Sequence, residues 1–466
     1  MKMVNFVHTV LDFKKLSPAQ KIATSFLFVI LAGTILLILP ISNRNGEFFS
    51  PIDALFIATS ATCVTGLSTV TIADQFNAFG HLVIVLLIQV GGLGLMTFMA
   101  VLILVLKNRL SLNEKKVMKE MLNQDKVFDM KKFLLDILRY TLFFEAIGTI
   151  ILSFRMVDDY GPIEGIMKSA FLSVSAFCNA GFDTLGSISL QGYVHDPLVC
   201  ITIMLLIVLG GLGFAVWFDV RDKLDALFHR QISFKRFHHT LSLHTKVVLL
   251  ISMVLILVPA VMIMALEFHN PQTMGDFTIP EKMMSSAFES IALRTAGFTS
   301  INYANITAGT QMLMMVVMFI GGSPGGTAGG IKTTTFAILV VYMINMLKGK
   351  ERIVVMRRQI ANSTVIRAMG IFFINIVALL TGMFFLAITQ PQTLNMIAFE
   401  CVSAMATVGS SLGLTSLLTF GGKVIIILLM YIGRIGISTL IISLVKPRHS
   451  DGKDKISYPD GTIIVG

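Results

Sequence analysis

The sequence predicts an all-α polytopic membrane protein built from four tandem helix–pore-loop–helix repeats around a central pore. Three observations lead to this fold class. The composition is apolar, with 55% hydrophobic residues, 14% charged residues and a mean hydropathy of +0.80, values outside the usual range of soluble domains. Long apolar runs recur along the chain, and a short glycine motif recurs between them at nearly constant spacing. We therefore expect eight spanning helices and four re-entrant half-helices.

Eight apolar runs are long enough to cross a bilayer as helices, which takes roughly 20 residues. The clearest run, residues 80–106, contains no Asp, Glu, Lys or Arg over 27 positions. The eight runs cover residues 22–42, 80–106, 133–154, 197–218, 247–266, 308–346, 366–389 and 421–445. An even number of spans predicts that both termini lie on the same side of the membrane. The first run is long and lacks a cleavage site, so we interpret it as a retained helix rather than a signal peptide.

Four short motifs, each ending in a glycine, lie between the members of successive pairs of runs. They are Cys63-Val64-Thr65-Gly66, Cys178-Asn179-Ala180-Gly181, Arg294-Thr295-Ala296-Gly297 and Ala406-Thr407-Val408-Gly409. Their glycines are 115, 116 and 112 residues apart, and a second glycine mark follows each one after 25, 29, 24 and 24 residues. The second marks begin at Gly91, Gly210, Gly321 and Gly433. This order indicates one unit copied four times.

A short helical segment precedes each glycine motif, over residues 51–61, 162–177, 281–293 and 395–404. These segments are too short to span, and non-helical backbone at membrane depth is tolerated only where it lines water or is buried in protein. We therefore expect each segment to enter and leave on one side. Its partly negative C-terminal end would then face the pore axis, which favours a cation there over an anion.

Basic residues predict the orientation of the chain. Of the 37 Lys and Arg residues, 28 lie in five segments that alternate with the glycine motifs, namely residues 1–21, 107–132, 219–246, 347–367 and 446–455. By the positive-inside rule these segments and both termini are cytoplasmic, so the glycine motifs enter from outside. The basic charge is therefore explained by topology, and nucleic-acid binding is not indicated.

The third glycine mark differs from the others because it interrupts its inner helix. It consists of Gly321, Gly322, Ser323, Pro324, Gly325, Gly326, Thr327, Ala328, Gly329 and Gly330. Six glycines and a proline do not continue a helix stably. We interpret the segment as a gate or obstruction beneath the glycine motifs; the alternative is a passive kink. The lysine that follows lies at the wrong spacing for a phosphate-binding loop.

Two cations lie within the apolar runs, where a charge costs about 2.5–3.5 kcal/mol and is functional by default. Arg434 replaces the second residue of the fourth glycine mark, and Lys332 ends the broken third inner helix. Both would lie near the pore and either repel a cation or hold the gate by its carbonyls. The alternative is a structural pairing with Glu145 or Glu400. Asp183, after the second motif glycine, is a candidate for collecting cations at the outer mouth.

No motif predicts catalysis or a resident metal. Cys63, Cys178, Cys200 and Cys401 have no metal-ligand spacing, and we interpret them as buried thiols. The histidines of residues 229–244 have no acidic partner at a fixed spacing. We find no clustered catalytic set, so we do not expect an enzyme.

The ordered set of four glycine motifs, the glycine-rich third mark and Arg434 resembles the Trk/Ktr/HKT superfamily of potassium transporters over essentially the whole chain. The resemblance extends to the KtrB-type membrane subunits of bacterial Ktr systems. The C-terminal residues 458–466 are similar to the tail of these subunits. Any single glycine motif is weak support, whereas the ordered set of four is specific.

The resemblance implies the function and the partners. It implies a gated potassium uptake pore in a bacterial cytoplasmic membrane, of a kind that sodium often stimulates. The pore would act as a homodimer with a cytosolic KtrA-type nucleotide-binding ring that carries any nucleotide. It assigns K⁺ to a selectivity filter and the gate to residues 321–330 with Lys332 and Arg434. The filter residues would be Val64, Thr65, Gly66, Asn179, Ala180, Gly181, Thr295, Ala296, Gly297, Thr407, Val408 and Gly409. Sodium-preferring relatives often have serine at the first glycine, so Gly66 favours potassium.

The repeats divide the chain into consecutive segments. These are 1–21, a cytoplasmic N-terminal segment; 22–106, repeat one; 107–220, repeat two; 221–346, repeat three with the gating loop; 347–446, repeat four; and 447–466, a cytoplasmic tail. The membrane potential suffices as driving force, since about 2.3 kcal/mol per charge per 100 mV corresponds to roughly 50-fold accumulation. The alternative is a sodium- or proton-coupled secondary symporter, which would usually show inverted repeats and a midplane carboxylate relay.

Overall fold

The computed structural model describes residues 18–94, 130–231, 233–350, 352–437 and 439–440. Several predictions lie outside the described residues. They concern the N-terminal segment up to residue 17, the end of the run 80–106, nearly all of the basic loop 107–132 and the tail 447–466.

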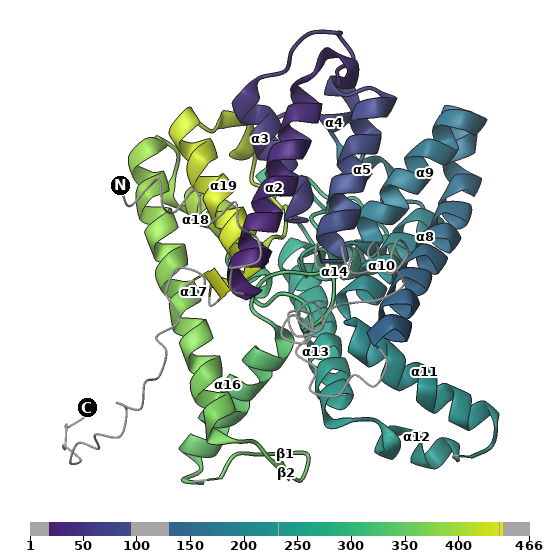
Figure 1. Cartoon of the computed structure of the whole chain (residues 1–466), viewed down its shortest axis with the longest axis vertical. Helices are drawn as coiled ribbons and strands as arrows, with labels where there is room; N and C mark the ends of the chain where they lie inside the picture. Colours follow the sequence, from purple (N-terminus) through teal and green to yellow (C-terminus); the bar gives the residue numbers. More distant parts are fainter. Residues whose placement is uncertain (1–17, 95–129, 232, 351, 438, 441–466) are drawn as a thin grey trace.

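The described chain is helical and repeats one unit four times: a long outer helix, a short pore helix and an inner helix (Figure 1). The outer helices are α2 (Pro18–Ile38), α8 (Met130–Tyr160), α13 (Leu243–Glu267) and α17 (Asn362–Thr389). The pore helices are α3 (Pro51–Thr62), α9 (Pro162–Phe177), α14 (Ile279–Ala292) and α18 (Leu394–Ala406). The inner helices are α5 (Ala78–Gly92), α10 (Pro197–Gly211), α15 (Ala308–Phe319) and α19 (Phe420–Ile435). The expected re-entrant segments thus agree with the pore helices to within two residues at each end.

Local sequence explains where the pore helices begin. Proline occupies the first turn of α3, α9 and α14, where its missing N–H and fixed φ cost nothing. In α14 a capping box is added, since the Glu281 carboxylate accepts a 2.8 Å hydrogen bond from the Thr278 backbone N–H. The carboxylate also lies 2.7 Å from His195 Nδ1. Hydrogen bonds from Thr278, followed by that from His195, lower the pKa of Glu281 to about 2.

The second inner helix corrects one part of the expectation of eight spanning helices. Among the described residues, four helices are long and apolar enough to cross a membrane by themselves, and all four are outer helices. The run 197–218 is not one helix, because the chain turns by 99° between α10 and α11 (Phe214–Phe228). The turn is made at Gly213, whose φ of +91° lies in the region that glycine readily adopts. The run 308–346 is divided into α15 and α16 (Thr333–Leu347), as the glycine-rich segment 321–330 predicted.

Contacts between repeats close the four units into a ring. Within a repeat the outer helix packs on its own pore helix, as α2 does on α3 and α8 on α9. Between repeats each inner helix packs on the next pore helix: α5 on α9, α10 on α14, α15 on α18, and α19 back on α3. The last of these contacts joins the fourth repeat to the first. All four pore helices therefore surround one axis.

Short elements complete the chain. Between the repeats' main helices lie η1 (Pro40–Ser42), α4 (Ile72–Gln75), η2 (Ser189–Tyr193), η3 (Tyr303–Asn305) and η4 (Thr415–Leu417). At the other end of the molecule, Figure 1 shows α11, α12 (Phe234–Thr240), the end of α16 and a hairpin of β1 (Val354–Val355) and β2 (Arg358–Gln359). The hairpin is antiparallel, with Val354 opposite Gln359. These elements carry the basic segments 219–246 and 347–367, so described basic loops gather at one end.

An ion pair fastens the contact that closes the ring. Lys423 Nζ at the start of α19 lies 2.6 Å from Asp53 Oδ1 in the first turn of α3, although the two residues are 370 positions apart. The side chains are 17% and 14% exposed. Such a partly buried pair is screened less by solvent than a surface pair.

We expect Asp53→Asn and Lys423→Met each to lower the melting temperature of the detergent-solubilised protein. The loss should correspond to about 1–3 kcal/mol, between the values for exposed and buried pairs. The double variant should lose less than the sum of the single variants, because each single variant leaves one charge without its partner. Strictly additive losses would show that the pair does not hold α19 against α3.

Candidate functional site

The four glycine motifs meet at the C-terminal ends of the pore helices. In every motif the backbone makes a tight turn, because both the first residue of the predicted filter triplet and its glycine have positive φ. The values are +55° for Val64, +58° for Asn179, +66° for Thr295, +53° for Thr407, +96° for Gly66, +72° for Gly181, +71° for Gly297 and +97° for Gly409. Residues other than glycine rarely adopt this conformation. Its recurrence at four equivalent positions shows that the copied sequence unit is also a copied backbone.

The four motif glycines form a closed ring. A Cβ added to each glycine would lie 2.2–2.6 Å from the carbonyl oxygen of the residue before the glycine of the next repeat. The oxygens met by Gly66, Gly181, Gly297 and Gly409 are those of Ala180, Ala296, Val408 and Thr65, respectively. Side chains do not fit at such distances. The ring therefore requires glycine four times, both for contact and for φ.

Backbone hydrogen bonds tie the ring to the pore helices. The N–H groups of Thr65, Ala180 and Val408 donate to carbonyls five residues earlier, at 2.7–2.9 Å. In the third repeat Ala296 donates instead to Ala292, four residues earlier, at 2.9 Å. The hydrogen-bonded turn that ends at the residue before the glycine is thus shorter by one residue in the third repeat than in the other three, which is an asymmetry within the fourfold pattern.

Several buried hydroxyls beside the ring have no hydrogen-bond partner in the part of the chain that the structure describes. They include the Oγ1 atoms of Thr65, Thr295 and Thr407, which belong to the predicted filter triplets. Buried polar groups are normally hydrogen-bonded, so an unpaired one calls for a water or an ion. Hydroxyl and carbonyl oxygens are suitable ligands for a dehydrated alkali cation.

Two buried carboxylates, Glu289 in α14 and Glu400 in α18, hold the backbone that follows the ring. Glu289 accepts hydrogen bonds from Ser300 N at 2.7 Å, from Ser300 Oγ at 2.8 Å and from the Tyr303 hydroxyl. Glu400 accepts from the hydroxyls of Ser411 and Thr415. Sequence reasoning missed this role. A signal was available, because both residues follow a buried Phe that is equivalent in all four pore helices.

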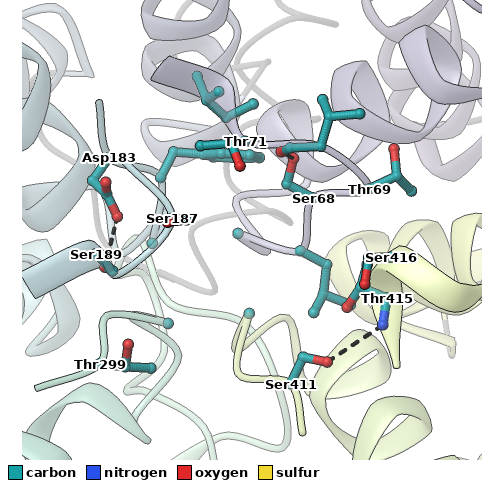
Figure 2. Close-up of a pocket in the computed structure, with 18 of the residues that line it drawn as sticks. Ser68, Thr69, Thr71, Asp183, Ser187, Ser189, Thr299, Ser411, Thr415 and Ser416 are labelled. Atoms are coloured by element: carbon teal, nitrogen blue, oxygen red, sulfur yellow. Dashed lines mark hydrogen bonds between the residues drawn. The ribbon is translucent and has the colours of Figure 1, made fainter. Parts of the chain in front are cut away.

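A cavity of about 350 Å³ opens above the ring and is lined by all four motif glycines. We call this cavity the vestibule. Figure 2 shows its polar side chains coming from loops of all four repeats; they are Ser68, Thr69, Thr71, Asp183, Ser187, Ser189, Thr299, Ser411, Thr415 and Ser416. Hydroxyls dominate the lining, so the vestibule can solvate a cation with neutral oxygens.

Asp183 is the one acidic residue that lines the vestibule among the described residues. Its carboxylate accepts from Leu185 N at 2.9 Å and from Ser189 Oγ at 2.6 Å. Burial raises the pKa of the Asp183 carboxyl above its usual range, although these hydrogen bonds and the nearby Lys168 act in the opposite direction. Asp183 thus lies where the sequence predicted a charge, at the mouth of the vestibule, but its carboxylate is half-buried and engaged.

The glycine-rich segment 321–330 lies on the other side of the ring and is packed rather than loose. It folds on itself through backbone bonds from Gly321 N to Ile331 O at 2.9 Å and from Gly322 N to Gly329 O at 3.3 Å. Gly321, Gly322 and Gly329 have no room for a Cβ, because each would meet an atom within 2.0–2.3 Å. The glycines are therefore required by close packing as well as by the break in the helix.

This segment is docked onto the end of α10 in the second repeat. Ser323 N donates to Gly211 O at 3.1 Å, and Thr327 N donates to Gly210 O at 3.3 Å. In return, Phe214 N donates to Gly325 O at 3.0 Å. The 99° turn after α10 leaves these carbonyls and this N–H free to bond. The segment between α15 and α16 therefore packs on the turn between α10 and α11.

Arg434 joins the glycine-rich segment to the first repeat. Its guanidinium donates to the carbonyl oxygens of Thr327 and Gly91, and at 3.4 Å to that of Gly92. No carboxylate pairs with Arg434 within the described ranges. Of the two alternatives left open by the sequence, the carbonyl contacts are observed, and pairing with Glu145 or Glu400 is not.

Other charged residues require corrections of position. Lys332 does not end α15 but precedes α16 as its N-cap, and its Nζ donates to Ala328 O at 2.7 Å. Glu145 lies in α8 and accepts from Gln89 Nε2 at 3.2 Å. Glu145 therefore joins α8 to α5, and no ion pair with Arg434 is observed among the described residues.

The second glycine marks of the other repeats have a packing role. A Cβ on Gly91, Gly210 or Gly433 would lie 1.8–2.0 Å from a carbonyl oxygen at the end of the pore helix in the same repeat. These oxygens belong to Thr62, Phe177 and Met405. Glycine thus lets the inner helix touch the pore-helix end, in agreement with the close-packing interpretation of small residues in membrane helices.

Comparison with known proteins gives concordant matches. A family model described as TrkH, cation transport protein, matches residues 5–454. The chain is 38% identical to Ktr system potassium uptake protein B of Bacillus subtilis over 457 residues, 98% of each chain. It is 39% identical to potassium/sodium uptake protein NtpJ of Enterococcus hirae over 458 residues, 97% of this chain and 98% of the relative. The crystal structure of the potassium transporter TrkH from Vibrio parahaemolyticus matches with a TM-score of 0.69 and 18% identity, covering 91% of this chain and 85% of that one.

We expect Arg434→Met to release residues 321–330. Hydrogen bonds to a charged donor contribute about 1.5–3 kcal/mol, so the amide hydrogens of this segment should exchange roughly 10- to 150-fold faster than in wild type. Hydrogen exchange measured by mass spectrometry on the purified protein tests this. Arg434→Lys, which keeps one charged donor, should give an intermediate rate, and peptides of α13 should not change. Equal exchange in wild type and Arg434→Met would mean that Arg434 does not hold the segment.

Proposed function

The chain belongs to the family of TrkH cation transport proteins, and from this premise we propose that it is the potassium-translocating pore subunit of a Ktr-type uptake system. The observation that carries the proposal is the ring of four glycines. Backbone carbonyls and unpaired threonine hydroxyls gather at this ring, beneath a vestibule lined by hydroxyls. Such oxygens can replace the hydration shell of K⁺. In this proposal the four predicted triplets are the selectivity filter, and K⁺ is the cargo.

Potassium is the first candidate for the transported ion. Relatives from Bacillus subtilis and Vibrio alginolyticus, each 38% identical, are named potassium uptake protein B, and Gly66 is the residue that the family resemblance associates with potassium. Sodium is the second candidate, because the relative from Enterococcus hirae is named a potassium/sodium uptake protein. The ring has one glycine per repeat, which gives a short filter and leaves room for both ions.

Transport in this proposal is channel-like and driven by the membrane potential. The orientation follows from charge: the basic segments 219–246 and 347–367 lie at the end away from the vestibule, so the positive-inside rule places the vestibule outside. A cation entering the vestibule then moves down the electrical gradient. Coupling to Na⁺ or H⁺ remains the alternative mechanism, and dependence of flux on a second ion gradient at fixed potential distinguishes it.

We propose that residues 321–330 are the gate and that Arg434 keeps it closed. The segment packs beneath the filter and bonds to the second repeat and to Arg434 of the fourth. Arg434 also bonds to Gly91 and so links the segment to the first repeat. Arg434 and Lys332 bind its carbonyls rather than carboxylates. Opening therefore needs only hydrogen bonds to break, and the exchange rate measured in the Arg434 variants also reports on this gate.

The relatives named Ktr system proteins belong by name to a system of several components. We propose a homodimer in the bacterial cytoplasmic membrane that binds a cytosolic KtrA-type nucleotide-binding ring. The described basic elements at one end, α11, α12 and the β1–β2 hairpin, offer a docking face. Sodium stimulation would be a property of this assembled system.

The transported ion is tested by uptake in a potassium-uptake-deficient bacterium. We expect the chain with its ring partner to restore growth at low potassium. Gly66→Ser should lower the preference for K⁺ over Na⁺ by about tenfold, or 1.4 kcal/mol, because its Cβ would meet the carbonyl of Ala180 at 2.6 Å. Gly46→Ser is the matched control, since Gly46 has φ +67° but no atom within 4 Å of an added Cβ. Unchanged selectivity in Gly66→Ser would exclude the ring as the filter.

The vestibule is tested through Asp183. Because its pKa is raised, the carboxylate becomes protonated, as the outside pH falls, at a higher pH than a free Asp would. Loss of one charge beside the ion's path removes about 0.5 kcal/mol of attraction in water, so the half-saturating potassium concentration should rise about twofold on acidification. Uptake in proteoliposomes at fixed membrane potential measures this. Asp183→Asn should show the higher concentration at every pH; an identical pH response in both proteins would contradict the assignment.

A further inference from the structure

The first residues of the four filter triplets are equivalent in backbone but not in side-chain contacts. Val64, Asn179, Thr295 and Thr407 all have positive φ. Val64 is apolar, and the hydroxyls of Thr295 and Thr407 have no partner within the described residues. Asn179 differs because its side-chain amide is bonded at both ends. In the second repeat, therefore, side-chain hydrogen bonds to other parts of the chain hold the first filter residue in place.

The amide of Asn179 contacts three other parts of the chain. Its Nδ2 lies 3.4 Å from the carbonyls of both Ile207 and Arg294, in α10 and at the end of α14. Its Oδ1 accepts a 2.8 Å hydrogen bond from Thr327 Oγ1 in the glycine-rich segment. This assignment of the amide is consistent, since Nδ2 faces two acceptors and Oδ1 faces a hydroxyl. Asn179 and Thr327 are both fully buried.

All the polar groups of Thr327 are hydrogen-bonded, and its hydroxyl connects the gate to the filter. Its N–H donates to Gly210 O, and its carbonyl accepts from Arg434. Its hydroxyl bonds to Asn179 Oδ1 and lies 3.3 Å from Phe177 O, the end of the second pore helix. A movement of the gate that displaces Thr327 must therefore leave the buried amide oxygen of Asn179 without its donor, which is unfavourable.

The glycine-rich segment also touches the filter in the fourth repeat. A Cβ added to Gly329 would lie 2.0 Å from Thr407 Oγ1, and one added to Gly330 would lie 3.4 Å from Ala406 O. The segment 327–330 thus touches the filter residues of the second and fourth repeats. Only the contact to the second repeat is a side-chain hydrogen bond among the described residues.

We propose that Thr327 is a positioning residue for the filter, coupling the closed gate to the ion-binding conformation of Asn179. The proposal rests on the proposed function of the ring as a K⁺ filter. With the gate closed, the Thr327 hydroxyl fixes the left-handed turn at Asn179 and thereby the carbonyls of the second triplet. When the gate opens, this support is lost. Because coupling between two sites is reciprocal, K⁺ in the filter stabilises the closed gate, and an empty filter loosens it.

The first test is ion binding to purified protein with Thr327→Val, which has a similar shape but no hydroxyl. K⁺ binding is measured from the concentration dependence of thermal stabilisation, with Na⁺ as the competing ion. We expect Thr327→Val to bind K⁺ about tenfold more weakly and to lose discrimination against Na⁺, whereas Thr327→Ser keeps both. Thr333→Val is the matched control, because its buried hydroxyl pairs with Ser323 at 3.1 Å and does not contact the filter.

The second test begins with the wild-type protein, so its first comparison does not depend on how well a variant folds. Hydrogen exchange of residues 321–330 is compared in K⁺ and in choline. Exchange should be slower in K⁺ for wild type and Thr327→Ser, and the difference should be absent in Thr327→Val. A role of Thr327 in the gate alone would change exchange in all solutions without changing K⁺ affinity.

The outcomes separate this inference from the proposed function. If wild type shows no K⁺-specific stabilisation, the filter assignment itself fails. If wild type binds K⁺ but its loop exchange does not depend on K⁺, or if Thr327→Val keeps wild-type affinity and discrimination, the coupling through Thr327 is wrong while the filter assignment stands.

Discussion

The fold depends on one steric constraint, the contact of each motif glycine with a backbone carbonyl of the next repeat. At Gly66, Gly181, Gly297 and Gly409 an added Cβ would lie 2.2–2.6 Å from that oxygen. The contact runs from the first repeat to the second, third and fourth, and returns to the first. Because every step needs both a left-handed φ and the absence of a side chain, the ring forms only when all four repeats are present. The arrangement of inner helices on neighbouring pore helices follows from the same closure.

Backbone carbonyls are also the partners of the half-buried cations beneath the ring. Arg434 and Lys332 bind carbonyl oxygens of the glycine-rich segment. A segment of six glycines exposes its peptide groups because it has few side chains to cover them, and this provides acceptors without introducing buried carboxylates. Carboxylates are used instead above the ring, where Glu289 and Glu400 hold the loops that line the vestibule. The two faces of the ring thus differ in chemistry.

The four repeats are equivalent in backbone and specialised in side chains. The first and fourth repeats share a serine that accepts from the glycine N–H, as Ser60 does for Gly66 at 3.1 Å. The third repeat has a hydrogen-bonded turn before its glycine that is one residue shorter, and the second has an asparagine that reaches the glycine-rich segment. The side chain of Asn179 in the second repeat and the altered hydrogen-bond register of the third repeat therefore lie next to the glycine-rich break of the third inner helix, where a gate needs contacts that the other repeats do not make.

The sequence alone determined the class of fold, the order of outer, pore and inner helices, and the positions of the four glycines. These features follow from hydropathy and from glycine spacing, which are local or periodic properties. The pore-helix bounds agreed to within two residues because proline and the glycine motifs mark their ends. The glycine-rich interruption itself predicted the gate, and the family resemblance added the potassium filter; both roles remain predictions.

Tertiary structure alone decided which groups meet. The sequence did not show the turn of 99° after α10. Nor did it show that Arg434 bonds to the carbonyl of Gly91, 343 positions away, or that Thr327 bonds to Asn179. Such pairings have no local signal, because a carbonyl acceptor is present at every residue and its availability depends on where helices break and which repeats adjoin. The sequence thus specified the repeating unit, and closure of four units around one axis selected the contacts between them.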